Sequence, residues 1–136
     1  MKKTLVLNLT DYPGTPHEQD YAGRLCNGYA EWMPDDVVFT LNRWNWTLAD
    51  ASIAKCDHVL FTHRRTVVSA ARLTGVTDYY DTVERDPKDR SRFLPAKRRA
   101  IIGSQLSEGD PFYRKWVGEE DLPGTDNRNP VNYIDA

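Results

Sequence analysis

The pattern of apolar and polar positions predicts short strands that alternate with helices. Leu and Val fill most of residues 3–9, and a Pro-Gly loop follows, which is typical of a strand that ends in a turn. Residues 15–18 match a capping box, and apolar residues at helical spacing extend this helix to Pro34. The same patterns predict strands at residues 37–41, 59–63, 66–73 and 99–103, the last with a helix from Pro95 as the alternative, and a short helix from Thr47 to about Lys55.

Two of these strands are so close in sequence that they predict a hairpin. Only Arg64 and Arg65 separate residues 59–63 from residues 66–73, although Arg-Arg is not favoured turn chemistry. A polar, turn-rich insertion follows at residues 86–90.

Domain organisation follows from length and from the end of the chain. A chain of 136 residues is typical of one domain. The last stretch holds Pro-Gly and Asn-Pro pairs and few large aliphatic residues. We therefore expect one globular domain over residues 1–118 and an irregular C-terminal tail, residues 119–136, packed on it.

The net charge of −2, from 18 basic and 20 acidic side chains, excludes a globally basic nucleic-acid coat. The balance hides two opposed segments. Residues 84–103 carry seven basic and three acidic side chains, and residues 104–136 carry three basic and seven acidic ones. A local contact with nucleic acid is therefore compatible with the acidic average.

Composition favours a protein of the cytoplasm. No apolar run approaches the ~18 residues that a membrane helix needs, so we expect no membrane contact. Cys26 and Cys56 are not part of a CxxC pair, which favours a reducing compartment.

The sequence contains none of the common motifs for metal binding, nucleophilic hydrolysis or phosphate loops. The histidines, His17, His58 and His63, lack an HExxH pattern, and GxSxG, GxGxxG and GxxxxGK[ST] do not occur. We expect no metal and no cofactor, and no catalytic residue is identified.

A tryptophan-rich loop is the most distinctive chemical feature. Trp44 and Trp46 lie two residues apart, next to Arg43, and two such rings cannot easily enter one core. At least one ring is then a candidate stacking surface for a base. The alternative is one ring in the core and one over its edge.

Residues 55–63 and 66–76 resemble the centre of PUA-like β-barrels, the superfamily of EVE, ASCH and YTH domains. In that family a short helix leads to Gly-Asp, then a strand, a turn and a strand with small residues. Here Cys56 stands where the family has glycine, and the resemblance covers about residues 47–77. It implies an α+β fold, a small mixed or antiparallel β-barrel with two to three helices.

The resemblance also implies a function, the binding of nucleic acid or a modified base in an aromatic pocket. By position, that pocket would use Asn8, Thr10, Tyr12, Trp44 and Trp46. Basic residues near turns would contact phosphates, namely Arg43, Arg64, Arg65, Lys97 and Arg98.

Two other classes stay open. A Rossmann-like α/β sheet would suit a nucleoside- or nucleotide-processing enzyme with Asn8, Asp11, Tyr12 and Asp57 as first candidates, although a hairpin fits a parallel sheet badly. A small phage- or plasmid-type inhibitor would instead bind a protein partner through the acidic C-terminal tail.

Overall fold

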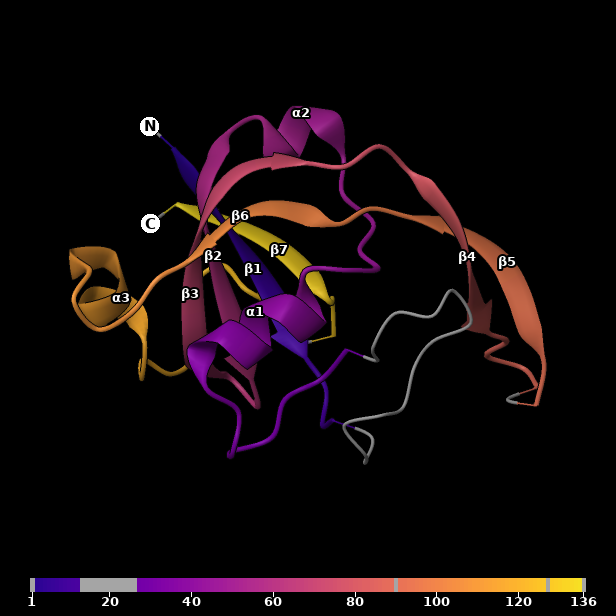
Figure 1. The fold of residues 1–136 in the computed structure, drawn as a ribbon, viewed down its shortest axis with the longest axis horizontal. Coiled ribbons are helices and arrows are strands. Elements are labelled where there is room, and N and C mark those ends of the chain that lie inside the picture. Colours follow the sequence, from indigo (N-terminus) through magenta and orange to yellow (C-terminus); the bar gives the residue numbers. More distant parts are fainter. Residues whose placement is uncertain (1, 13–26, 90, 127, 136) are drawn as a thin grey trace.

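A five-stranded mixed sheet forms the centre of the computed structural model, which describes residues 2–12, 27–89, 91–126 and 128–135. In spatial order the strands are β6 (Ile101–Gln105), β3 (Thr66–Val76), β2 (Cys56–His63), β1 (Lys3–Leu9) and β7 (Val131–Asp135). β1 and β2 are parallel, and the other neighbouring pairs in this sheet are antiparallel. The edge strands, β6 and β7, lie at opposite ends of the order, so the sheet is open and does not close into a barrel (Figure 1).

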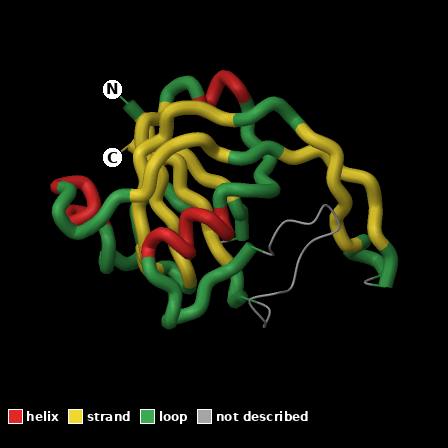
Figure 2. The backbone as a smooth tube through the Cα atoms, viewed as in Figure 1, coloured by secondary structure: helices red, strands yellow, loops and turns green. Residues whose placement is uncertain are grey.

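A separate two-stranded hairpin projects from one end of this sheet (Figures 1 and 2). It consists of β4 (Tyr80–Arg85) and β5 (Phe93–Arg98), which are antiparallel. We call this hairpin, with its connecting loop, the arm. Three short helices complete the described part of the chain: α1 (Asp35–Asn42), α2 (Asp50–Ile53) and α3 (Pro111–Trp116).

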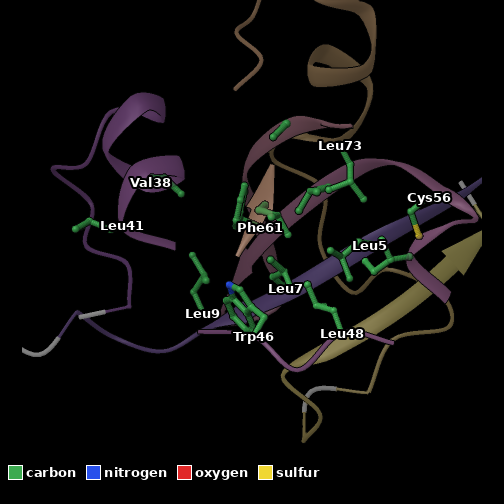
Figure 3. Close-up of a cluster of buried hydrophobic side chains, with 14 of the residues drawn as sticks. Leu5, Leu7, Leu9, Val38, Leu41, Trp46, Leu48, Cys56, Phe61 and Leu73 are labelled. Atoms are coloured by element: carbon green, nitrogen blue, oxygen red, sulfur yellow. The ribbon is translucent and has the colours of Figure 1, made fainter. Parts of the chain in front are cut away.

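The core lies on both faces of the sheet. Leu5, Val6 and Leu7 in the middle of β1 have no exposed surface. Both faces of this strand are covered, and this explains why its sequence is a continuous apolar run. Leu5 and Leu7 pack with Phe61 and Trp46 on the face that α1 covers (Figure 3). The middle side chain, Val6, packs on the opposite face with Ile134.

Much of the predicted strand pattern is confirmed. Residues 3–9 form β1, residues 59–63 and 66–73 lie in β2 and β3, and these two strands form the expected hairpin. The helix near residues 47–55 is shorter and begins at Asp50. The fold is a small β-rich α+β domain, as expected, whereas the single parallel pair within the sheet does not make a Rossmann-like sheet.

Residues 37–41, for which the apolar run predicts a strand, are instead part of α1. A short apolar run does not distinguish a strand from a buried helix. Here Pro34 occupies the N-cap, two aspartates fill the first turn, and Val38 and Leu41 share the buried face at a spacing of three.

Two other predictions concern the ends of the chain. The capping box at residues 15–18 lies outside the described residues, and residues 27–33, expected as the end of that helix, are not helical. The C-terminal tail is not irregular throughout, because residues 131–135 form β7, which pairs with β1. No helix in the described ranges is long and apolar enough to span a membrane.

Candidate site at the carboxyl ends of the parallel strands

The candidate site lies where the parallel strands β1 and β2 both end. Asn8 and Thr62 are register partners near these ends. The carboxyl ends of neighbouring parallel strands commonly border ligand sites, since loops leave the sheet there. In this chain the β2–β3 turn and the segment that leads to β7 meet at this edge.

A hollow of about 520 Å³ opens beside these residues. This volume lies in the range of ligand pockets, roughly 300–1,000 Å³. A smaller hollow of about 270 Å³ shares Asn8, Thr62 and Arg65 with it and adds Arg64. The larger hollow is lined by Asn8, Thr62, Arg65, Asp121, Leu122, Thr125, Asp126 and Arg128.

Asn8 forms part of the wall of the hollow. Its Nδ2 donates to the carbonyl oxygen of Asn129 at 2.7 Å, and its Oδ1 accepts a hydrogen bond from Oγ1 of Thr62. Its backbone N–H donates to the carbonyl oxygen of Pro130 at 2.9 Å. Asn8 therefore fixes the segment before β7 against the ends of β1 and β2, rather than presenting a free amide edge to a base.

The turn between β2 and β3 places two arginines at the hollow in an unfavourable backbone conformation. Arg64 has φ of 50° and Arg65 has φ of 71°, both in the left-handed region. A two-residue hairpin turn of this kind favours Asn-Gly, because other residues are strained there by about 1–2 kcal/mol each. Strain of this sort often marks a functional position.

Neighbouring backbone contacts hold this turn. The N–H of Asp121 donates to the carbonyl oxygen of Arg65 at 3.0 Å, and the N–H of Val67 donates to that of Glu119 at 2.9 Å. The segment at residues 119–121 thus runs beside the start of β3 and forms a wall of the hollow.

Two arginines that line the larger hollow each pair with an aspartate. Arg65 lies 3.5 Å from Asp121, and Arg128 lies 3.1 Å from Asp126. Arg128 lowers the pKa of Asp126 by hydrogen bonding to its carboxylate. The arginine side chains are 65% and 89% exposed, so solvent screens these pairs and they add little to the stability of the fold. An anion can compete for such guanidinium groups.

A third pair joins the turn to the end of β1. Nη2 of Arg64 donates to Oδ2 of Asp11 at 3.0 Å, and Nε2 of His63 donates to Oδ1 of the same carboxylate at 2.6 Å. These hydrogen bonds, that from His63 first, lower the pKa of Asp11. The ring of Tyr29 packs against His63 with 5.0 Å between centroids.

The two tryptophans of the predicted aromatic pocket do not form one. Trp46 is only 7% exposed, belongs to the core, and donates its Nε1 hydrogen bond to the carbonyl oxygen of Asn42 at 2.6 Å. It offers no open ring face for stacking. Trp44 is half-buried, lies edge-on to Tyr80, and has the guanidinium of Arg43 over its ring at 4.6 Å.

The other predicted base-binding residues are spread out. Thr10 is exposed, and its carbonyl oxygen accepts a hydrogen bond from the N–H of Tyr29 at 2.9 Å. Tyr12 packs edge-on against Trp32, whose side chain is 57% exposed. Of the predicted base-binding set, Asn8 alone lines the hollow.

The predicted phosphate-binding residues lie in three places. Arg43 lies over the ring of Trp44 and donates from Nε to the carbonyl oxygen of Ile101 at 3.1 Å. Arg64 and Arg65 lie at the hollow, as described above. Lys97 and Arg98 belong to β5 of the arm and pair there with acidic residues of β4. Asp57, the remaining candidate of the enzyme hypothesis, is the second residue of β2 and therefore lies at the opposite end of the strand from the hollow.

Several lining residues escaped the sequence analysis because they come from the supposed irregular tail. Asp121, Thr125, Asp126 and Arg128 are distant in sequence from β1 and β2. The turn signals between residues 123 and 130 could have indicated a fixed loop, since Asp126 accepts a hydrogen bond from the backbone N–H two residues on.

No cluster of three or more metal-ligating side chains occurs within the described ranges. Comparison with family models, with curated proteins and with solved structures finds no match for this chain.

Proposed function

We propose that this protein binds nucleic acid and receives a phosphate of the strand at the hollow beside the carboxyl ends of β1 and β2. The observation that carries the proposal is the convergence of Arg64, Arg65 and Arg128 on the two adjoining hollows. Guanidinium groups bind phosphate oxygens through paired N–H donors, and such contacts provide most of the affinity for nucleic acid.

The strained turn supports this role. Left-handed backbone at Arg64 and Arg65 directs two adjacent cationic side chains to the hollow, at positions where Asn-Gly would be more stable. In the protein without a ligand, Asp11, Asp121 and Asp126 balance the charges of the three arginines at the two hollows. Binding then exchanges weak, exposed ion pairs for charge-assisted hydrogen bonds to phosphate.

The proposal differs from the aromatic pocket expected by resemblance to PUA-like domains. It keeps nucleic acid as the partner, but it assigns binding to arginines rather than to Trp44 and Trp46. Because these side chains contact the backbone of the strand, we expect weak dependence on base sequence.

Fluorescence anisotropy with a labelled single-stranded oligonucleotide tests the proposal. We expect the double variant Arg65→Ala/Arg128→Ala to bind about tenfold or more weakly at low salt. The slope of log K against log salt concentration should fall by about 0.7 for each phosphate that the variant no longer neutralises.

The control is Arg72→Ala, which removes an exposed arginine from β3 near the opposite end of the β2–β3 pair. It should bind as the wild type does. Equal affinities of the wild type and the Arg65/Arg128 variant, or no binding by the wild type, would contradict the proposal. Thermal unfolding of each variant shows whether it is folded.

A further inference from the structure

The arm contributes none of the described residues that line the two hollows. Its two strands pair in register from Tyr80 with Arg98 to Arg85 with Phe93, apart from the five-stranded sheet. It extends beyond the end of that sheet as a narrow ribbon (Figures 1 and 2). In Figure 1 its tip and the β2–β3 turn both lie toward the lower side of the molecule.

The two faces of the arm differ. Along β5, exposed residues alternate with half-buried ones, so that Phe93, Pro95 and Lys97 share the open face. Phe93 remains 48% exposed, which is unusual for a large aromatic side chain. The open face therefore combines an apolar ring near the tip with a cation near the base.

At the tip, the carboxylates of Asp86 and Asp89 accept hydrogen bonds from residues of the same loop. Oδ1 of Asp86 accepts the backbone N–H of Lys88 at 2.8 Å, and Oδ1 of Asp89 accepts the hydroxyl of Ser91 at 2.6 Å. The hydrogen bonds from Ser91 lower the pKa of Asp89. Lys88 and Arg92 are exposed, and neither forms an ion pair with a residue in the described ranges.

The arm also carries an excess of positive charge. Residues 80–98 contain six basic and four acidic side chains. Two of the acidic residues lie on β4 and pair with β5: Asp81 lies 2.6 Å from Lys97, and Glu84 pairs with Arg98. Lys88 and Arg92 place exposed cationic groups at the tip beside the carboxylates of Asp86 and Asp89, and the arm as a whole keeps an excess of two positive charges that would attract a polyanion.

We propose that the arm is a second nucleic-acid contact, a β-ribbon that enters the major groove of duplex DNA. The major groove of B-form DNA admits a two-stranded ribbon, with Lys88 and Arg92 then reaching the flanking phosphates. The deep, narrow major groove of an RNA duplex does not admit it. This inference rests on the proposed function, because it presumes a nucleic-acid partner, and it identifies duplex DNA as that partner.

The test compares a short labelled DNA duplex, the corresponding RNA duplex and a single strand by fluorescence anisotropy. For Lys88→Glu/Arg92→Glu we expect affinity for the DNA duplex to fall about tenfold or more, with the salt slope lower by about 0.9 for each phosphate that is no longer neutralised. Single-strand binding should remain within about twofold of the wild type, because its proposed site is the hollow. The milder Lys88→Gln/Arg92→Gln variant should lower the slope in the same way.

The control with the same change of charge is Lys55→Glu/Arg72→Glu, at two exposed positions away from both the arm and the hollow. It should retain most of the duplex affinity. Wild-type affinity for duplex DNA in both arm variants, or equal affinity of the wild type for the RNA duplex, would overturn the proposal.

Two further outcomes separate this inference from the proposed function. Binding of the single strand without binding of duplex DNA would refute the arm contact and leave the hollow in place. Absence of binding to all three probes would refute both. A dimer that the arm variants dissociate, together with unchanged DNA binding, would overturn the inference and identify the tip of the arm as a contact between copies of this chain.

Discussion

Asp11, just beyond β1, accepts a hydrogen bond from Nε2 of His63, the last residue of β2, at 2.6 Å. The carboxylate also accepts a hydrogen bond from Arg64, so it connects the end of the parallel pair to the strained turn. Removing His63 should therefore change both the titration of Asp11 and the position of Arg64.

We expect His63→Ala to raise the pKa of Asp11 toward its ordinary value of 3.8, because the His63 hydrogen bond is the largest cause of the lowering. A lowered carboxyl pKa stabilises the fold above the ordinary value, and this contribution disappears as the pH falls through the lowered pKa. Carbon NMR of the side-chain carboxyl measures the titration. Arg64→Ala is the comparison and should also raise the pKa, because Arg64 donates the second hydrogen bond to this carboxylate. An unchanged pKa of Asp11 in either variant would contradict the assigned cause.

The β2–β3 turn should show a trade-off between stability and binding. Replacing Arg64 by Asn and Arg65 by Gly gives the residues that a turn with two left-handed positions favours. We expect the double variant to be more stable by about 1–2 kcal/mol in urea unfolding, since the strain is relieved. Oligonucleotide binding should weaken at the same time. Loss of stability in this variant would show that the arginine side chains stabilise the turn by more than its strain.

Arg99 is predicted to be a structural residue of the junction between the arm and the sheet. Its side chain is 8% exposed, pairs with Asp50 at 2.6 Å, and donates to the carbonyl oxygens of Leu48 and Thr77 at 3.0 and 2.9 Å. Arg99→Met keeps much of the packing but leaves both carbonyl groups without this donor, at a cost of about 2–4 kcal/mol in the free energy of unfolding.

Chemical unfolding of Arg99→Met measures that loss, and Arg98→Met is the matched control. Arg98 is the adjacent arginine, is half-buried, and pairs with Glu84 on the arm. Its replacement should have the smaller effect, because the Arg98 side chain is more exposed to solvent than that of Arg99. Equal losses in the two variants would contradict the assigned role of Arg99.

The strands of the central sheet were predictable where local pattern and burial agree. β1 is a continuous apolar run because both of its faces are covered, and β2 and β3 are joined by only two residues. α1 could not be assigned correctly from its short apolar run, because the two helical faces appear only when Val38 and Leu41 are seen against the sheet. β5 was missed because Pro95 and its charged residues obscure any strand pattern.

Only some residues of the candidate site could be predicted from the sequence. Asn8, Arg64 and Arg65 were identified from local sequence, as residues near the ends of predicted strands. Their meeting with Arg128 depends on the antiparallel pairing of β7 with β1, which is a contact between the two ends of the chain. The aromatic pocket rested on the resemblance, whereas Trp46 donates a hydrogen bond to the carbonyl oxygen of Asn42 and lies in the core, in line with the alternative of one ring in the core and one over its edge.

A half-buried carboxylate that joins three elements predicts a loss of stability at high pH. Asp35 of α1 accepts hydrogen bonds from the Ser69 hydroxyl of β3 at 2.6 Å and from the Tyr113 hydroxyl of α3 at 3.0 Å. Burial and this carboxylate raise the pKa of Tyr113 to about 12. A raised tyrosine pKa stabilises the fold below the ordinary value of 10.0, and this contribution is lost as the pH rises toward 12.

The variant Asp35→Asn should bring the titration of Tyr113 closer to its ordinary value, because the negative charge that opposes the tyrosinate is removed. Ultraviolet difference absorbance of tyrosinate, compared with a Tyr113→Phe protein, isolates this one titration. The Asp35→Asn protein should also lose less stability between neutral pH and strongly alkaline pH than the wild type does. An unchanged midpoint would mean that burial alone holds Tyr113 protonated, and the Asp35 cluster would then be a structural contact without a pH dependence of its own.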